Sequence, residues 1–171
     1  MIRALLICSM ALMGCRPVAR RPHGPDRAAA MAAIERLLAN DRRAHLETDA
    51  GLLATSIADT LVSFDAGTVR AQPRDSVRAM FERYFAGARY NAWEDIQRPR
   101  ISFANDNSLA WVSRVVCVDR DEPDSSGGRR RRVFVSAYVG HYVWRSGGWR
   151  MTTVSSTLSP HPPARCPSSK D

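Results

Sequence analysis

The sequence predicts a single α+β domain, in which helices precede a long sheet and pack on one of its faces. Two observations support this class. Apolar residues recur at helical spacing in the first half, whereas residues 133–145 and 149–157 are β-branched and aromatic runs separated by Ser-Gly-Gly. Two such runs joined by a Gly-containing loop are typical of a β-hairpin, and helices followed by strands favour an α+β layer. The 171 residues, 44% of them hydrophobic, are enough for one ordinary core.

The expected helices lie at 28–48, at 49–57 and from Pro73 to Gly87. The first is Ala-rich, Asp26 can cap it, and Pro is favoured where the third begins. The apolar positions of the first helix follow helical spacing at Met31, Ile34, Leu37 and Leu38. Those of the third are Val77, Met80, Phe81, Tyr84 and Phe85.

The expected strands, in order, are 59–65, 68–70, 90–103, 109–119, 133–145 and 149–157. The first alternates as a strand, with Leu61 and Ser63 on one side and Val62 and Phe64 on the other, and Gly67 turns it into the second. Pro99 indicates that the third is an edge strand or contains a bulge. Residues 119–132 are expected to form a charged, solvated loop before the closing hairpin, because acidic residues face basic ones across it.

The first fourteen residues have the composition of a bacterial lipoprotein signal peptide. A short positive start precedes an apolar run, residues 4–13, that is too short to span a bilayer. The run ends in Leu12-Met13-Gly14-Cys15, which resembles the bacterial lipobox. The resemblance implies cleavage after Gly14 and a lipid on Cys15. That lipid would anchor the protein in the bacterial cell envelope, at the outer membrane or the periplasmic face; without it, we expect a secreted protein.

The remaining segments and cysteines follow from this assignment. We expect a tether at 15–26, the domain at 27–157 and a disordered tail at 158–171, because the flanking segments are rich in Pro, Gly and Ser.

The compartment would allow Cys117 and Cys166 to form a disulfide. The preferred expectation is instead a buried free Cys117 and an unpaired Cys166. No Cys or His spacing indicates a metal site, and no cofactor is expected.

The charge pattern excludes one class of partner. The formal net charge is +8, and nearly all of the positive charge is Arg. The Arg residues are scattered outside Arg129–Arg132, and no basic stripe with interleaved aromatic residues is present. We therefore expect no nucleic-acid partner.

A set of short motifs over residues 27–157 resembles the nuclear-transport-factor-2-like superfamily, in its SnoaL-like branch. The motifs are Ala44-His45-x-x-x-Asp49, Leu52-Leu53, Ala58-Asp59, Gly67, Tyr84-Phe85, Ser108-Leu-Ala-Trp-Val112 and Gly147-Gly-Trp-Arg-Met151. The resemblance implies a cone-shaped fold, with a curved antiparallel sheet wrapped against three helices around a central pocket, and a homodimer. Members of this superfamily include ketosteroid isomerase, polyketide cyclases, dehydratases and proteins that only bind ligands or partners.

Asp41 and His45 form the candidate catalytic pair. At about 100° per residue they lie on the same helix face as the apolar stripe. A His oriented by a carboxylate is suited to act as a general base towards a carbon acid. The alternative is a solvated Asp41 near the helix end and a half-buried His45 with a structural role.

The candidate ligand-binding residues are Tyr84, Trp93, Trp111, Tyr138 and Ser155. Many relatives carry a His six residues after the Trp of the last strand, where this chain has Ser155, so the resemblance supports catalysis less well. Alternation in 133–145 places Tyr138 on one face and Val139 on the other. Which face lines the pocket and which packs in a dimer is left open.

Three functions remain compatible with the sequence. The first is an envelope protein whose pocket binds a small, largely apolar molecule, with no specific activity assigned. The second is an isomerase, cyclase or dehydratase that uses His45 and Asp41 as its general base pair. The third is a dimerising module whose own side chains fill the pocket. They differ in whether polar groups converge on a cavity.

Overall fold

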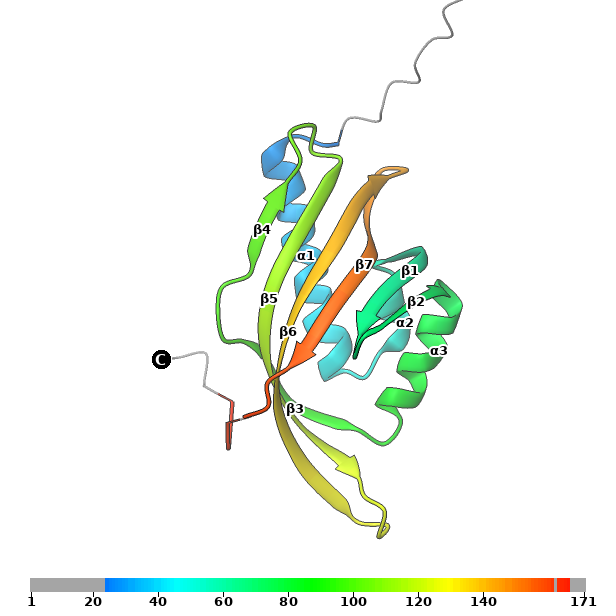
Figure 1. The fold of residues 1–171 in the computed structure, drawn as a ribbon, viewed down its shortest axis with the longest axis vertical. Coiled ribbons are helices and arrows are strands. Elements are labelled where there is room, and N and C mark those ends of the chain that lie inside the picture. Colours follow the sequence, from blue (N-terminus) through cyan, green and yellow to red (C-terminus); the bar gives the residue numbers. More distant parts are fainter. Residues whose placement is uncertain (1–23, 162, 167–171) are drawn as a thin grey trace, which may run out of the picture.

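The computed structural model describes residues 24–161 and 163–166 (Figure 1). The expected signal peptide, the lipidation site at Cys15 and most of the tether lie outside the described residues. Within the described part, three helices pack on one face of a curved seven-stranded sheet, so the predicted α+β class is confirmed. No helix among these residues is both long and apolar enough to cross a membrane.

The helices are α1 (Arg27–Leu46), α2 (Ala50–Ala54) and α3 (Arg74–Phe85). The Asp26 carboxylate caps α1 by accepting the backbone N–H groups of Ala28 and Ala29, at 3.0 Å each. The predicted apolar stripe is buried at Ile34 and Leu38. In Figure 1, α1 lies behind β4, β5 and β6, whereas α2 and α3 lie beside β1 and β2.

The strands are β1 (Ile57–Asp65), β2 (Thr68–Pro73), β3 (Arg89–Asp95), β4 (Arg100–Phe103), β5 (Leu109–Pro123), β6 (Arg129–Arg145) and β7 (Gly148–Leu158). Their order is β2-β1-β7-β6-β5-β3, with β4 also paired to β5. All neighbours are antiparallel except β1 and β7. The sheet is therefore mixed, not wholly antiparallel as expected. A parallel pair needs a long connection, and here the five strands β2–β6 supply it.

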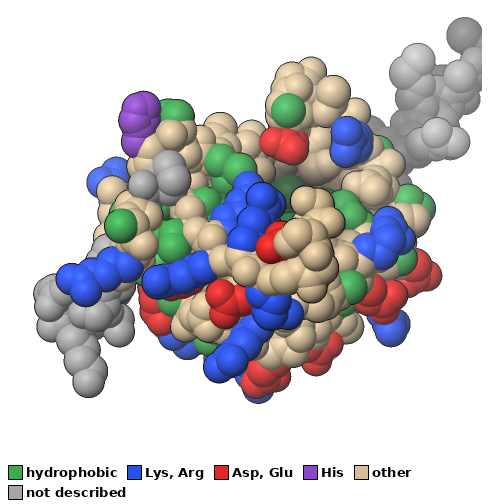
Figure 2. Space-filling view, turned by 90° about the horizontal axis from the view of Figure 1, so that it is seen from below, with side chains coloured by type: hydrophobic (Ala, Val, Ile, Leu, Met, Phe, Trp, Pro, Cys, Tyr) green, Lys and Arg blue, Asp and Glu red, His purple; other side chains and the backbone are tan. Residues whose placement is uncertain are grey.

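Two predicted segments differ from the structure. Residues 90–103 form two strands, β3 and β4, because Pro99 lacks an N–H for a ladder and lies in the connection between them. The expected charged loop at 119–132 is instead mostly hairpin: β5 runs to Pro123 and β6 starts at Arg129. Cross-strand pairs of opposite charge hold this extension, with Asp121 opposite Arg131. Figure 2, which looks onto this end of the molecule, shows acidic side chains among the arginines.

The closing hairpin of β6 and β7 is confirmed. Its two turn residues, Ser146 and Gly147, have φ values of 49° and 77°. Positive φ at both positions defines the turn whose twist matches the flanking strands. The ladder then pairs Trp144 with Trp149, and a bulge lies next to His141.

The expectation of two unpaired cysteines is wrong, because Cys117 and Cys166 form a disulfide across 49 residues of sequence. The tail can reach Cys117 because it continues past β7 along the sheet, where the Ser159 N–H donates to the Val135 carbonyl at 2.9 Å. Closing a loop of this length removes about 4 kcal/mol of unfolded-state entropy. The tail is thus attached covalently to β5.

Alternate side chains of β5 point towards the helices and form the core. Val116 and Val118 belong to a cluster with α2, α3 and β3, whereas Ala110 and Val112 join one with α1, β4 and Trp149. The opposite side chains of β5, such as Trp111, face away from the helices. We call these two sides the inner and outer faces of the sheet.

Candidate functional site

A buried arginine organises the inner face. Arg114 occupies one of the inward positions of β5, between Val112 and Val116, and its side chain is 1% exposed. Its Nη1 donates to Asp41 Oδ2 on α1 at 2.7 Å. Its Nε and Nη2 donate to the two carboxylate oxygens of Asp95 on β3, the second at 3.0 Å. One guanidinium therefore joins a helix and two strands.

Tyr138 on β6 completes this network, because its hydroxyl oxygen accepts from Arg114 Nη1 at 3.1 Å. Burial opposes the charge on Arg114, but Tyr138, Asp95 and Asp41 outweigh it and raise the pKa of the guanidinium. Burial also raises the pKa of Tyr138 well above its ordinary value, so the phenol stays protonated. The network is one fixed cation shared by two carboxylates and a neutral phenol.

His45 lies at the end of the same helix face but has different partners. Its ring stacks on Trp93, with centroids 3.5 Å apart and planes inclined by 13°. Phe85 and Tyr90 meet it edge-on. Nδ1 lies 2.9 Å from the backbone carbonyl oxygen of Asp41, which can only accept, so Nδ1 carries the proton and Nε2 the lone pair. The imidazole is therefore held in one tautomer by an aromatic cage and its own helix.

Burial lowers the pKa of His45, and the nearby Asp41 carboxylate offsets this only in part. The imidazole is consequently neutral at physiological pH. Asp41 Oδ1 lies 3.5 Å from Nδ1, farther than the backbone oxygen, and the other oxygen of that carboxylate binds Arg114. The structure thus brings Asp41 and His45 together but directs the carboxylate mainly to Arg114. Their role as a catalytic pair stays a prediction.

A second buried arginine, Arg120, lies further along the inner face of β5 and is 5% exposed. Nη1 donates to the Tyr90 hydroxyl at 3.0 Å, and Nη2 to Glu122 at 2.5 Å. The guanidinium carbon lies 4.3 Å from the centroid of the Tyr84 ring and 5.8 Å from that of Phe134. Arg120 Nε is buried and has no hydrogen-bond partner within the described residues. This N–H is a free donor between α3 and β6.

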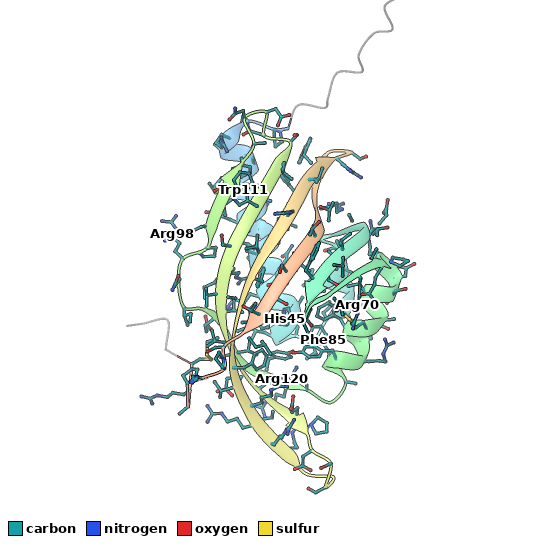
Figure 3. All side chains as sticks on the ribbon, viewed as in Figure 1. His45, Arg70, Phe85, Arg98, Trp111 and Arg120 are labelled. Carbon is teal, nitrogen blue, oxygen red and sulfur yellow. A yellow bond between two sulfur atoms is a disulfide. The ribbon has the colours of Figure 1, made fainter. Side chains whose placement is uncertain are left out.

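The structure separates the predicted ligand-binding residues into two groups. Tyr84, Trp93 and Tyr138 belong to the inner side, around Arg114 and Arg120. Trp111 lies on the outer face and is 40% exposed, and Ser155 lines a groove on that same face. Figure 3 shows the separation, with His45, Phe85 and Arg120 near one another and Trp111 away from them. The five residues therefore do not converge on one site, although Tyr138 also contributes to the lining of the outer groove.

Sequence reasoning missed both buried arginines. Their signal is the alternation of β5, in which Ala110, Val112, Val116 and Val118 occupy inward positions. Arg114 and Arg120 occupy inward positions of the same alternation. A charged side chain therefore lies where an apolar one is expected. An inward charge in a core strand indicates a buried partner. Among the described residues, no group of three or more His, Cys, Asp or Glu could hold a metal ion.

No protein-family model matches this sequence, and no curated protein is significantly similar to it. Solved structures do resemble it. A hexachlorocyclohexane dehydrochlorinase from Novosphingobium barchaimii is 17% identical, with a TM-score of 0.61 over 81% of this chain and 93% of that chain. An NTF2-like protein with a cystatin-like fold from Novosphingobium aromaticivorans is 17% identical, with a TM-score of 0.58 over 78% and 84%.

A third structure, named as a candidate Ca/calmodulin-dependent kinase II association domain from Exiguobacterium sibiricum, is 14% identical. Its TM-score is 0.62 over 81% of this chain and 99% of that chain. Identities this low show the fold alone. The chain therefore has the NTF2-like fold.

Exposed apolar side chains on the outer face bear on the expected homodimer. Leu109, Trp111 and Val139 are 37–40% exposed there, and Phe64 on the neighbouring β1 is 43% exposed. The homodimer itself stays a prediction for this chain.

Replacing Arg114 by Met is expected to lower the free energy of unfolding by about 3–5 kcal/mol, because two carboxylates would lose their buried counter-charge. Urea unfolding followed by circular dichroism measures the change. Arg78→Met is the matched control, since it breaks an exposed pair with Glu82 and should change stability by less than about 1 kcal/mol. Equal losses in the two variants would contradict a central role for Arg114.

The neutral, buried His45 predicts a pH-dependent stability. Because folding lowers the His45 pKa from 6.5, the unfolded chain binds the proton more readily. The stabilising contribution is present above pH 6.5 and is lost as the pH falls through the folded-state pKa. Urea unfolding at about pH 8 and about pH 5.5 should show this loss in the wild type and a smaller one in His45→Gln. His141→Gln, at an exposed position, is the control and should lose as much stability between the two pH values as the wild type. If His45→Gln also lost as much as the wild type, the assignment of this pH dependence to His45 would be refuted.

Proposed function

We propose that this protein is a non-catalytic binding domain of the SnoaL-like type, which holds a small, largely apolar molecule on the inner face of its sheet. The observation that carries the proposal is the free N–H of Arg120 beside the Tyr84 ring. A buried donor without a partner costs about 1–3 kcal/mol. A ligand oxygen that accepts from Nε would remove that cost.

The surroundings of Arg120 suit an apolar ligand. Phe81, Phe134, Met151 and Val154 pack against the inner core while remaining partly exposed. Tyr84 at the end of α3 is 41% exposed. Apolar lining with a few fixed polar groups is the usual composition of a small-molecule site. We therefore expect a molecule with an apolar body and one oxygen acceptor.

The partners of His45 and Asp41 favour binding over catalysis. A His–carboxylate dyad needs the carboxylate on the ring nitrogen opposite the reacting one. Here the Nδ1 proton goes to a backbone carbonyl, and Asp41 is neutralised by Arg114. The chemistry of an isomerase, cyclase or dehydratase would need this arrangement to change, so that function ranks second.

The proposed location is the bacterial envelope, with the chain anchored by a lipid on Cys15. The lipobox-like residues Leu12–Cys15 support this, although they lie outside the described residues. The Cys117–Cys166 bond gives independent support, because disulfides persist in oxidising compartments such as the periplasm.

The ligand site is tested with an aromatic sulfonate, 1-anilinonaphthalene-8-sulfonate, whose apolar rings and oxygens match the proposed class. The wild type should bind it saturably, and Arg120→Met should weaken binding at least about tenfold, because a hydrogen bond to a charged donor is lost. Fluorescence titration measures the affinity, and cooperative urea unfolding shows that each variant is folded.

Arg83→Met is the control for this titration, since Arg83 is an exposed arginine near the C-terminal end of α3. It should bind the dye like the wild type. Tyr84→Ala keeps Arg120 but removes the ring beside it, and should also weaken binding. Wild-type affinity in a folded Arg120→Met protein would exclude this site.

The anchor predicts a covalent change at Cys15. The full chain expressed in a Gram-negative host should incorporate radiolabelled palmitate and sediment with membranes, whereas Cys15→Ser should do neither. Cys166→Ser is the control, because the same number of cysteines remains while Cys15 is intact. Labelling of Cys15→Ser, or none in the wild type, would overturn the lipoprotein assignment.

A further inference from the structure

A groove on the outer face of the sheet has no role in the proposed function. Its volume is about 480 Å³, within the range of small-molecule sites. It lies across β5, β6 and β7, beside the connection from β3 to β4, where Figure 3 places Arg98. Its polar lining consists of Gln97, Arg98, Arg100, Ser113, Ser155 and Thr157, together with Arg114 and Tyr138, whose side chains hydrogen-bond to each other.

Strand register explains why this surface is hollow. Ser113 pairs with Val139, and Val139 with Ser155, so these residues form a row across three strands. Arg100 on β4 pairs with Ser113 and extends the row. The next row towards the tail holds Val115, Ala137 and Thr157, which are also small. Strands are spaced by about 4.8 Å, so short side chains over three strands leave a shallow trough bordered by arginines.

Apart from Arg114 and Tyr138, the polar groups of the groove are uncommitted. Within the part of the chain that the structure describes, none of the other six polar side chains makes a hydrogen bond or an ion pair. The inner face differs, because Arg114 binds two carboxylates and Arg120 binds Glu122. Two unpaired guanidinium groups beside three free hydroxyls form a surface whose donors have no acceptor within the described part of the chain.

The chemistry of these groups specifies a ligand class. Guanidinium groups bind phosphate oxygens through paired N–H donors, and two of them match the charge of a phosphate dianion. The hydroxyls of Ser113, Ser155 and Thr157 can donate to and accept from ligand hydroxyls. We propose that this groove binds a small phosphorylated polyol, with its phosphate at Arg98 and Arg100 and its hydroxyls on the serine and threonine floor.

The site is separate from the one proposed around Arg120. The sheet lies between them, because Ser155 and Arg98 line the outer groove whereas Arg120 points inward. A negative binding result at one site therefore does not imply a negative result at the other. The phosphorylated polyol could be free in the compartment or be the headgroup of an anionic phospholipid. A soluble probe and a lipid vesicle distinguish the two sources.

The experiment titrates the purified chain with glycerol 3-phosphate and with inorganic phosphate by calorimetry. A parallel arm measures sedimentation with phosphatidylglycerol vesicles against phosphatidylcholine vesicles. Both arms use a protein concentration at which sedimentation velocity shows a monomer, since the exposed apolar residues share this face. We expect saturable binding of glycerol 3-phosphate, of phosphatidylglycerol vesicles or of both.

Charge reversal tests the arginines. Arg98→Glu/Arg100→Glu should weaken binding at least tenfold. The matched control is Arg36→Glu/Arg70→Glu, which changes the net charge equally at two exposed arginines on α1 and β2. Figure 3 places Arg70 at the opposite edge from Arg98. Equal weakening in the control would show that only the overall charge attracts the ligand, and would overturn the site.

The hydroxyl floor is tested separately. Ser113→Ala/Ser155→Ala should weaken the binding of glycerol 3-phosphate several-fold and leave the affinity for inorganic phosphate unchanged, because only the polyol contacts those hydroxyls. Binding of glycerol 3-phosphate in solution identifies a free ligand, whereas binding to phosphatidylglycerol vesicles alone identifies a lipid headgroup. Equal wild-type affinity for inorganic phosphate and glycerol 3-phosphate would refute the polyol. Failure of the wild type to bind any of these probes would refute the groove as a binding site.

Discussion

The burial of Arg114 is the constraint on which the inner face depends. A guanidinium with 1% exposure must recover its lost hydration from fixed partners. It does so from Asp41 on α1, Asp95 on β3 and Tyr138 on β6, so the positions of these three elements are coupled. Such a network contributes less to net stability than its number of contacts suggests, because desolvation offsets most of the attraction. Its main effect is to fix one arrangement of the cone interior.

This constraint also decides what the interior can do. Asp41, which would orient a catalytic His45, is already neutralised by Arg114, and the His45 ring is stacked on Trp93. The same fold thus keeps its polar interior occupied by its own side chains at Arg114. Within the described residues it leaves buried donors without a partner at Arg120 Nε and at the indole N–H groups of Trp93 and Trp149. On the other side of the sheet, Arg98 and Arg100 border a groove with no acid among the described residues to bind them. The two faces therefore differ in whether their cations are satisfied internally.

Several site features could be read from local pattern and others could not. Helical spacing correctly placed Asp41 and His45 on the core-facing side of α1, because a helix has a fixed period. It gave no information about Arg114, which lies 73 residues from Asp41 in sequence. Alternation in β6 correctly divided Tyr138 from Val139, and only the position of α1 shows which of them is inward. Ser155 and Trp111 were grouped with the inner residues for lack of that information.

By itself, the sequence determined the α+β class, the three helices and the closing hairpin, because these depend on periodicity, turn residues and interactions between near neighbours. The tertiary structure decided the parallel pairing of β1 with β7, the Cys117–Cys166 bond, the partners of Arg114 and the outward position of Ser155. Each of these joins residues far apart in the chain. Local propensities do not encode such contacts, because they form only when the whole sheet packs on α1 and the segment after β7 reaches β5.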